Sequence, residues 1–386
     1  MMRMRTAALV VCTFLALPST AKSQVPVTSG TSAHEKLHLT RVEAPALKDS
    51  NATQFLAVDS KGHPLLLRGD TLEVFRLGAD ASFDHRVGKL ACDFSPAPAY
   101  AAAFDPKGSK WAVSSTREVA LCDFVKEQRP PGLEWMVSSL TYSRSGPLVA
   151  ITSIGPGPEA GEAQFKAKDP LVFDLADGRW RPVAWAPVQE FKEMPANPMD
   201  VLIEGKAQSD ASICAGPKNS IWLASWNSYR LQKLSASEKP EREIVVGSGQ
   251  IEWQKLDKKD REHEALSLKA QGADPMPIHF AGSAVPRGVL RALLCGRDGT
   301  LYLVVSTPDG GLALDRFDPA QNVLERVLLD GATVSSGPMT AALGTDQLWL
   351  GGRLAADGLW RISLDDLAAA HWKPVKGAKV DGKPLG

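Results

Sequence analysis

The sequence predicts an all-β fold, a β-propeller, in which small antiparallel sheets stand side by side in a ring. Three observations predict it. A short motif, a turn followed by an apolar strand, occurs six times along the 386 residues. Three of the intervals between copies match the ~40–45 residues of one propeller blade. Strand-like runs before and after each motif complete a unit of about four strands.

The six copies share one kind of turn residue and an apolar residue three positions later. The turn residue is glycine, asparagine or aspartate, the types that tolerate the left-handed backbone of tight hairpins. Aromatic residues, which suit a pleated strand, dominate the later position. The copies are DSKGHPLLL (59–67), DPKGSKWAV (105–113), SRSGPLVAI (143–151), GPKNSIWLA (216–224), GRDGTLYLV (296–304) and GTDQLWLGG (344–352).

The spacing of the turn residues predicts the number of blades. Positions 62, 108, 146, 219, 299 and 346 are separated by 46, 38, 73, 80 and 47 residues. The two long intervals match one blade plus an insertion of roughly 30 residues. We therefore predict six blades, with a seventh, degenerate copy inside a long interval as the alternative. A β-sandwich with coincidental turns is the competing architecture, but it would not place six copies in phase.

The first residues have the pattern of a targeting segment. MMRMR (1–5) is basic, AALVVCTFLAL (7–17) is apolar, and small residues follow. This pattern predicts a signal peptide at 1–23 and is too short for a membrane span. We expect a secreted or periplasmic protein that is not inserted in the membrane after signal removal. Residues 24–376 are predicted to form a single propeller domain and 377–386 a flexible tail.

A propeller must close its ring, which removes exposed strand edges. Two segments can supply the outer strand of the last blade: LHLTRVE (37–43), which precedes the first copy, or HWKPV (371–375). Export also permits disulfides. Cys92, Cys122, Cys214 and Cys295 allow up to two bridges in three connectivities, with buried free thiols as the alternative.

The fourth copy carries a family resemblance. GPKNSIWLASWNSYRLQKL (216–234) resembles an NHL-type blade: a turn, a short aromatic strand, then Asn227 and Arg230 in an Asn-x-x-Arg arrangement before the next strand. The resemblance implies a six-bladed propeller of the broad group that holds NHL repeats, TolB-like domains and gluconolactonase-like enzymes. It describes a scaffold and specifies no reaction.

The three longest inserts are predicted to lie on one face of the ring, here called the top face. They are 153–169, 186–210 and 247–286, and each adjoins the start of a first strand or the connection between second and third strands. Long structured loops commonly carry function. The candidate ligand-binding residues on this face are Arg117, Trp226, Asn227, Arg230, Arg291 and Arg353.

These side chains support two interpretations. The arginines could bind an anionic ligand through bidentate hydrogen bonds, or simply form surface ion pairs with neighbouring acids. Trp226, with Tyr100 and Trp253, could form a stacking platform for a sugar or peptide, or pack the inserts down.

No motif of a known reaction is evident. HEKLH (34–38) matches a zinc-binding helix pattern but runs into strand-like LHLTRVE, so it is set aside. A gluconolactonase-like metal site would draw on Asn51, Glu134 and Asp210, whose spacing fits no pattern. We predict no catalytic residue, metal ligand or cofactor.

The sequence therefore favours an exported, non-enzymatic propeller that binds a peptide, glycan or protein partner on its top face. Lysine plus arginine equals aspartate plus glutamate, 44 against 44, which argues against nucleic acid as a partner. The alternatives are a metal-dependent gluconolactonase-like hydrolase and a structural subunit of an envelope complex.

Overall fold

Each copy of the repeated motif leads from the first strand of a small antiparallel sheet into its second strand. The computed structural model describes residues 35–42, 52–78, 83–93, 99–105, 107, 110–115, 118–131, 133, 137–142, 148–152, 171–174, 178–182, 211–234, 240–249, 253–255, 284–286, 289–332, 338–352, 354 and 357–385. Residues 1–34, with the predicted signal peptide, lie outside these ranges.

The described residues form six such sheets, each running outward in chain order from its first strand. In the first three sheets the strands are β3 (Gln54–Val58), β4 (Pro64–Arg68), β5 (Glu73–Leu77) and β6 (Phe83–Lys89); β7 (Ala101–Phe104), β8 (Trp111–Ser114), β9 (Val119–Cys122) and β10 (Glu127–Gln128); and β11 (Ser139–Tyr142), β12 (Leu148–Thr152), β13 (Leu171–Asp174) and β14 (Arg179–Pro182).

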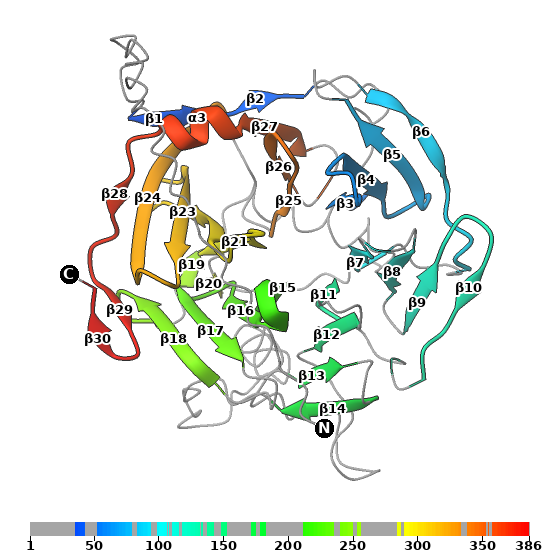
Figure 1. The fold of residues 1–386 in the computed structure, drawn as a ribbon, viewed down its shortest axis with the longest axis horizontal. Helices are drawn as coiled ribbons and strands as arrows, with labels where there is room; N and C mark the ends of the chain where they lie inside the picture. The colour runs from blue at the N-terminus through cyan, green and yellow to red at the C-terminus, as the bar shows by residue number, and fades with distance from the viewer. Residues whose placement is uncertain are drawn as a thin grey trace, which may run out of the picture. The chain divides into compact units, whose positions relative to one another are not determined.

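The last three sheets follow the same plan. Their strands are β15 (Ala211–Ala215), β16 (Ile221–Ser225), β17 (Arg230–Leu234) and β18 (Pro240–Val246); β21 (Leu290–Cys295), β22 (Leu301–Ser306), β23 (Leu312–Asp318) and β24 (Val323–Asp330); and β25 (Thr340–Leu343), β26 (Gln347–Gly351) and β27 (Leu359–Ser363). The first strands contact one another in a closed circle, β3 with β7, β7 with β11, and so on until β25 meets β3 again (Figure 1). The predicted all-β propeller arrangement is confirmed.

The sheets are held together by an apolar seam between each pair of neighbours. Successive side chains of a strand point to opposite faces, and both faces are buried here. In β4, Leu65 and Leu67 pack in the seam with the second sheet, whereas Leu66 packs in the seam with the sixth. Trp222 and Phe317 meet edge-on across the seam between the fourth and fifth sheets, with ring centroids 6.1 Å apart.

The predicted left-handed turn residues are confirmed at two positions. Gly62 has φ +86° and Gly299 has φ +98°. A Cβ on Gly62 would lie 2.2 Å from the Thr345 side chain, so this turn packs against the turn of the sixth sheet. In the fourth copy the left-handed residue is Lys218, with φ 56°, one position before the predicted Asn219. A short 3₁₀ turn at Pro217–Asn219 shifts the strained position there.

Both ends of the chain close the ring from the outside. From the N-terminal side, β1 (Lys36–His38) pairs in parallel with β24 of the fifth sheet, and β2 (Thr40–Arg41) becomes the outer strand of the sixth sheet. The prediction that 37–43 supplies this outer strand is confirmed. The HEKLH segment is strand over 36–38, so its helical zinc pattern is not formed there.

After β27 the chain turns back along the outside of the ring. Helix α3 (Leu364–Ala369) is capped by Ser363, whose hydroxyl accepts hydrogen bonds from the Asp365 and Asp366 amides. Strand β28 (Lys373–Pro374) then pairs with β24 of the fifth sheet, so the alternative placement of HWKPV in the last blade is wrong. None of the helices in the described ranges is long and apolar enough to span a membrane.

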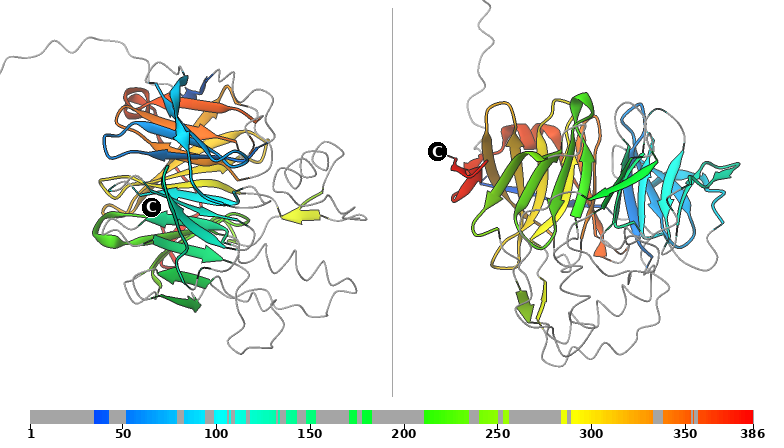
Figure 2. Two further views of the ribbon diagram at one scale, coloured as in Figure 1. Left: turned by 90° about the vertical axis from the view of Figure 1, so that its right-hand side faces the viewer. Right: turned by 90° about the horizontal axis from the view of Figure 1, so that it is seen from below.

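The C-terminal segment, expected to be a flexible tail, is a pair of strands. β29 (Ala378–Val380) extends the fourth sheet by pairing with β18, and β30 (Lys383–Pro384) pairs with β29 (Figures 1 and 2). Ala378 and Val380 are buried in the seam cluster of the fourth and fifth sheets. The segment is polar overall, but apolar and polar residues alternate in β29, so one face of the strand can be buried when it pairs with the edge of β18.

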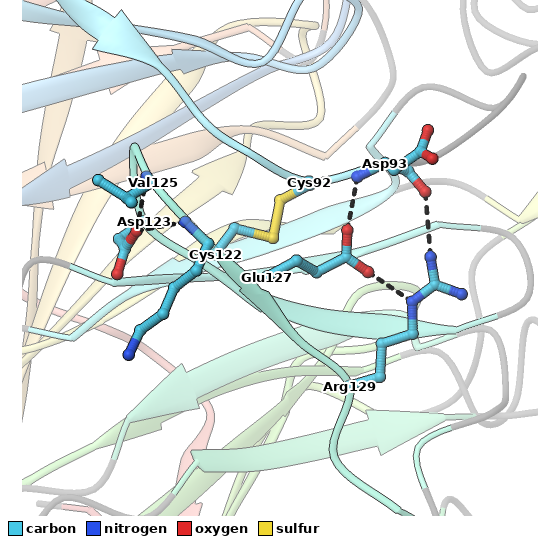
Figure 3. Close-up of a disulfide and its surroundings, with 8 residues drawn as sticks. Cys92, Asp93, Cys122, Asp123, Val125, Glu127 and Arg129 are labelled. Atoms are coloured by element: carbon cyan, nitrogen blue, oxygen red, sulfur yellow. Dashed lines mark hydrogen bonds and ion pairs between the residues drawn. A yellow bond between two sulfur atoms is a disulfide. The ribbon is translucent and has the colours of Figure 1, made fainter.

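Two disulfides each tie neighbouring sheets together. Cys92, just after β6 of the first sheet, is bonded to Cys122 of β9, and Cys214 of β15 is bonded to Cys295 of β21. Beside the first bridge, the Glu127 carboxylate accepts hydrogen bonds from the Asp93 amide (2.6 Å) and from the Arg129 guanidinium (Figure 3). One of the three connectivities left open by the sequence is therefore selected.

The predicted inserts lie mostly outside the described residues. This holds for all of 153–169 and 186–210, whereas β19 (Trp253–Lys255) and β20 (Ala284–Pro286) of the third form a two-stranded antiparallel sheet. That insert leaves β18 at the end that pairs with Arg230, the start of β17, and enters the start of β21. Both attachment points are on the top face, the end of the ring where the first strands begin.

Ending the chain after Val375 should lower the free energy of unfolding by about 2–4 kcal/mol, because Ala378 and Val380 leave a buried seam and the edge of β18 is exposed. Thermal and urea unfolding followed by circular dichroism would measure this. Lys379→Ala, at an exposed position of the same strand, is the control and should change stability by under ~0.5 kcal/mol. An unchanged truncated protein would contradict the pairing of β29 with β18.

Replacing each disulfide with two alanines should destabilise the ring unequally. The sequence separations are 81 residues for Cys214–Cys295 and 30 for Cys92–Cys122. Loop entropy then predicts losses of about 4.5 and about 3.7 kcal/mol respectively. Denaturant unfolding of both double variants, beside the wild type with and without reductant, provides the comparison; a wild type insensitive to reductant would count against both bridges.

Candidate functional site

The first strands enclose a central channel that opens on the top face. Residues of all six first strands line a cavity of about 330 Å³. Where several of these strands begin, a second cavity of about 130 Å³ forms the mouth of the channel. The mouth is lined by three aromatic residues, Phe55, Tyr100 and Trp226, by aliphatic residues such as Leu140 and Met339, and by polar but uncharged residues.

The channel wall is made of strand edges. Each first strand is hydrogen-bonded to its own sheet on one side only, because it stands at the end of the strand order. Its other edge presents backbone N–H and C=O groups, which must be met by side chains, water or a ligand. Side chains satisfy some of these backbone groups. The Ser139 hydroxyl accepts a hydrogen bond from the Ile213 amide (3.3 Å), and the Thr340 hydroxyl accepts one from the Leu56 amide (2.7 Å).

Trp226 is held at the mouth by contacts with two sheets. It follows β16 directly, and its indole N–H donates a hydrogen bond to the Ser212 hydroxyl on β15. Its carbonyl oxygen accepts from the amides of Val289 (2.6 Å) and Leu290 (3.1 Å), at the start of the fifth sheet. The ring is therefore placed on the top face at the seam between the fourth and fifth sheets.

A buried ionic group anchors the same loop from below. The Tyr229 hydroxyl donates to Asp315 at 2.5 Å, and Arg326 donates to both oxygens of that carboxylate at 2.7 and 2.8 Å. Asp315 has no exposed surface. Burial, and then the Asp315 charge, raises the pKa of Tyr229 well above its ordinary value, so the phenol remains a donor at neutral pH. The loop 226–229 is thus tied to strands β23 and β24.

The predicted site residues do not gather in one place. Of the six, Trp226 lines the mouth. Arg230 lies on β17, two strands outward from the channel, and pairs with Glu243 at 3.0 Å, the ion-pair alternative left open by the sequence. Asn227 is 7% exposed and Arg291 is 3% exposed, so both are buried. Arg117 and Arg353 lie outside the described residues.

The mouth contains residues that the sequence prediction missed. Gln54, Ser139, Ser212 and Thr340 line it beside Trp226 and Tyr100. One signal could have found them: the first-strand runs of three copies, SLTY (139–142), SICA (212–215) and MTAAL (339–343), each carry a hydroxyl residue at the first or second position. Of the three proposed stacking residues, Tyr100 and Trp226 share the mouth; the side chain of Trp253 is outside the described part of the structure.

The described residues hold no group of three or more histidine, cysteine, aspartate or glutamate side chains placed to bind a metal. The residues considered for a gluconolactonase-like site, Asn51, Glu134 and Asp210, all fall outside the described ranges. The described mouth offers uncharged hydrogen-bonding groups, aromatic residues and aliphatic residues.

Comparisons with known proteins report similarity in architecture. No protein-family model and no curated protein matches the chain. Among solved structures it is similar to a virginiamycin B lyase from Staphylococcus aureus (11% identity, TM-score 0.43, covering 85% of this chain and 99% of that one). It is also similar to U3-55K (9% identity, TM-score 0.47, covering 84% of this chain and 98% of that one). A third similar structure is that of the RRP9 WD40 repeats (9% identity, TM-score 0.45, covering 84% of this chain and 97% of that one). Similarity at this level carries no argument about activity.

Asp315→Asn should lower the free energy of unfolding by about 3 kcal/mol, because it leaves the Arg326 charge without its buried partner. Breaking a fully buried ion pair costs about 3–5 kcal/mol. The lower value is expected here because 28% of the Arg326 side chain is exposed to solvent. Glu325→Gln is the matched control: it breaks the more exposed Arg316–Glu325 pair on the same two strands and should cost under ~1 kcal/mol. Equal effects of the two variants in urea unfolding would contradict an anchoring role for Asp315.

Proposed function

We propose that the chain is an exported, six-bladed propeller of the NHL and TolB-like group that binds a ligand at the mouth of its central channel and catalyses no reaction. The six sheets are its blades, the N-terminal segment is its signal peptide, and the secreted or periplasmic space is its location. The ligand is a peptide, a glycan or a segment of a partner protein.

One observation carries this proposal: a cavity where the first strands begin, with the Trp226 and Tyr100 rings beside uncharged hydroxyl and amide groups. Aromatic side chains supply a large contact area at low entropic cost, and few convergent polar groups give orientation. The 247–286 insert attaches on the same face, between β18 and β21.

The arginine-based interpretation has less support. Arg230 is engaged by Glu243 and stands away from the channel, and Arg291 is buried. An anion site built on either would first require the loss of existing contacts. Binding through aromatic and neutral polar groups requires no such change.

Trp226→Ala should weaken binding about tenfold, because it removes an aromatic side chain that lines the mouth. The measurement is binding of the purified protein to an immobilised panel of oligosaccharides and peptides, with affinities of the positive members determined by calorimetry. Phe124→Ala, which removes a 39% exposed ring outside the channel, is the control and should bind as the wild type does.

Equal binding by Trp226→Ala and the wild type would remove the mouth from consideration. Turnover of lactones or esters by the purified protein, abolished by a chelator, would instead favour the hydrolase alternative.

A further inference from the structure

Three hydroxyl groups encircle the passage between the mouth and the channel below it. Ser139, Ser212 and Thr340 line both cavities. They are equivalent in strand register in the third, fourth and sixth sheets, where they pair with Ile151, Ala224 and Gly351 of the second strands. We call them the neck hydroxyls.

In the hydrogen bonds that it makes within the described structure, each neck hydroxyl is the acceptor. Ser139 and Thr340 accept a hydrogen bond from the first strand of the next sheet, through the Ile213 and Leu56 amides, and Ser212 accepts from the indole of Trp226. None of these bonds uses the hydroxyl hydrogen. A hydroxyl group has one donor besides its lone pairs, so within the described structure each neck hydroxyl keeps a donor for something in the cavity.

Gln54 adds a complementary group. Its amide nitrogen donates to the carbonyl oxygens of Gly352 (2.9 Å), Leu354 (3.2 Å) and Gly358 (3.0 Å), which fixes the orientation of the amide. Its oxygen, Oε1, is buried and has no hydrogen-bond partner, although the residue is only 2% exposed. A buried acceptor left unsatisfied is costly. The mouth therefore combines unused donors with an acceptor that is enclosed in the free protein and that a ligand would reach only by a movement of the Gln54 side chain.

The described lining carries no carboxylate, amine or guanidinium. An ionised ligand would lose its hydration here without gaining an opposite charge, which is unfavourable. The complement of unused donors, an unused acceptor and two aromatic rings is a neutral molecule whose polar groups both donate and accept. Each hydroxyl of a sugar both donates and accepts, whereas a peptide offers separate N–H and C=O groups about 3.4 Å per residue apart.

We propose that the neck hydroxyls and Gln54 bind one neutral sugar unit, the end of a glycan, with Trp226 and Tyr100 packing on its apolar C–H faces. This inference rests on the proposed function and specifies its ligand class. A cavity of about 330 Å³ below the mouth, near the lower end of the usual range for ligand sites, suits a terminal unit better than an internal stretch of chain.

The test uses the full mature chain and a defined set of probes: methyl glycosides of glucose, galactose and mannose, the matching uronic acids and 2-amino sugars, and capped neutral dipeptides. Binding is measured by saturation-transfer NMR and calorimetry. At least one neutral glycoside should bind, and its acidic and amino counterparts should bind at least tenfold more weakly. Absence of binding by every neutral glycoside, or equal binding of the charged analogues, would overturn the proposal.

The neck hydroxyls are tested by substitution. Ser212→Ala and Thr340→Val should each weaken binding of the neutral glycoside about five- to tenfold, whereas Thr340→Ser, which keeps the hydroxyl, should bind as the wild type does. Thr300→Val, in a turn between β21 and β22 remote from the mouth, is the matched control. If Thr340→Val fails to fold because Leu56 loses its acceptor, Ser212→Ala decides. Unchanged binding in Ser212→Ala and Ser139→Ala would refute the assignment.

The same probes separate this inference from the proposed function. If the dipeptides bind in a Trp226-dependent way and the glycosides do not, the mouth is a binding site for peptides and the sugar assignment falls. If no probe binding depends on Trp226, both fall together.

Discussion

Burial of both faces of every sheet is the constraint on which the rest of this structure depends. A single four-stranded sheet has two apolar faces here, as the packing of Leu65 and Leu66 into different seams shows, and such a sheet is stable only when neighbours cover both. That condition is met for all six sheets only if the ring is closed. The two chain ends perform the closure, with β1 and β2 from one side and β28 and β29 from the other, along the outer edges of the fourth, fifth and sixth sheets.

Closure also creates the candidate site. The first strand of each sheet stands at the inner end of the strand order. The free edges of these strands therefore face a common channel. Their backbone groups cannot all be satisfied within a sheet. Small hydroxyl side chains at the start of the strands, Ser139 and Thr340, meet part of this demand across the seams. The polar, uncharged character of the mouth is therefore a consequence of the architecture, and ligand binding can exploit it.

The fold was predictable from the sequence to the extent that it depends on local chemistry. Turn residues such as Gly62 and Gly299, and the apolar residues after them, mark each sheet because left-handed turns and pleated strands restrict residue type. Long-range pairing was not predictable in the same way. The polar segment 376–386 reads as a tail until the open edge of β18 is known. An arginine in a loop predicts an anion site equally well as an ion pair, and Arg230 forms an ion pair with Glu243 across two strands. Ser139, Ser212 and Thr340 differ little from ordinary strand residues until the ring brings them together.

The mouth and the stability of one seam are coupled. Trp226 is placed by its bonds to Val289 and Leu290 above, and its loop is anchored by Tyr229 on the buried Asp315 carboxylate. The same seam between the fourth and fifth sheets carries the Cys214–Cys295 disulfide in the channel wall and the buried residues of β29 on the outside. The two sheets that position Trp226 are thus held together by backbone hydrogen bonds, a buried ionic group, a disulfide and the buried side chains of an added strand.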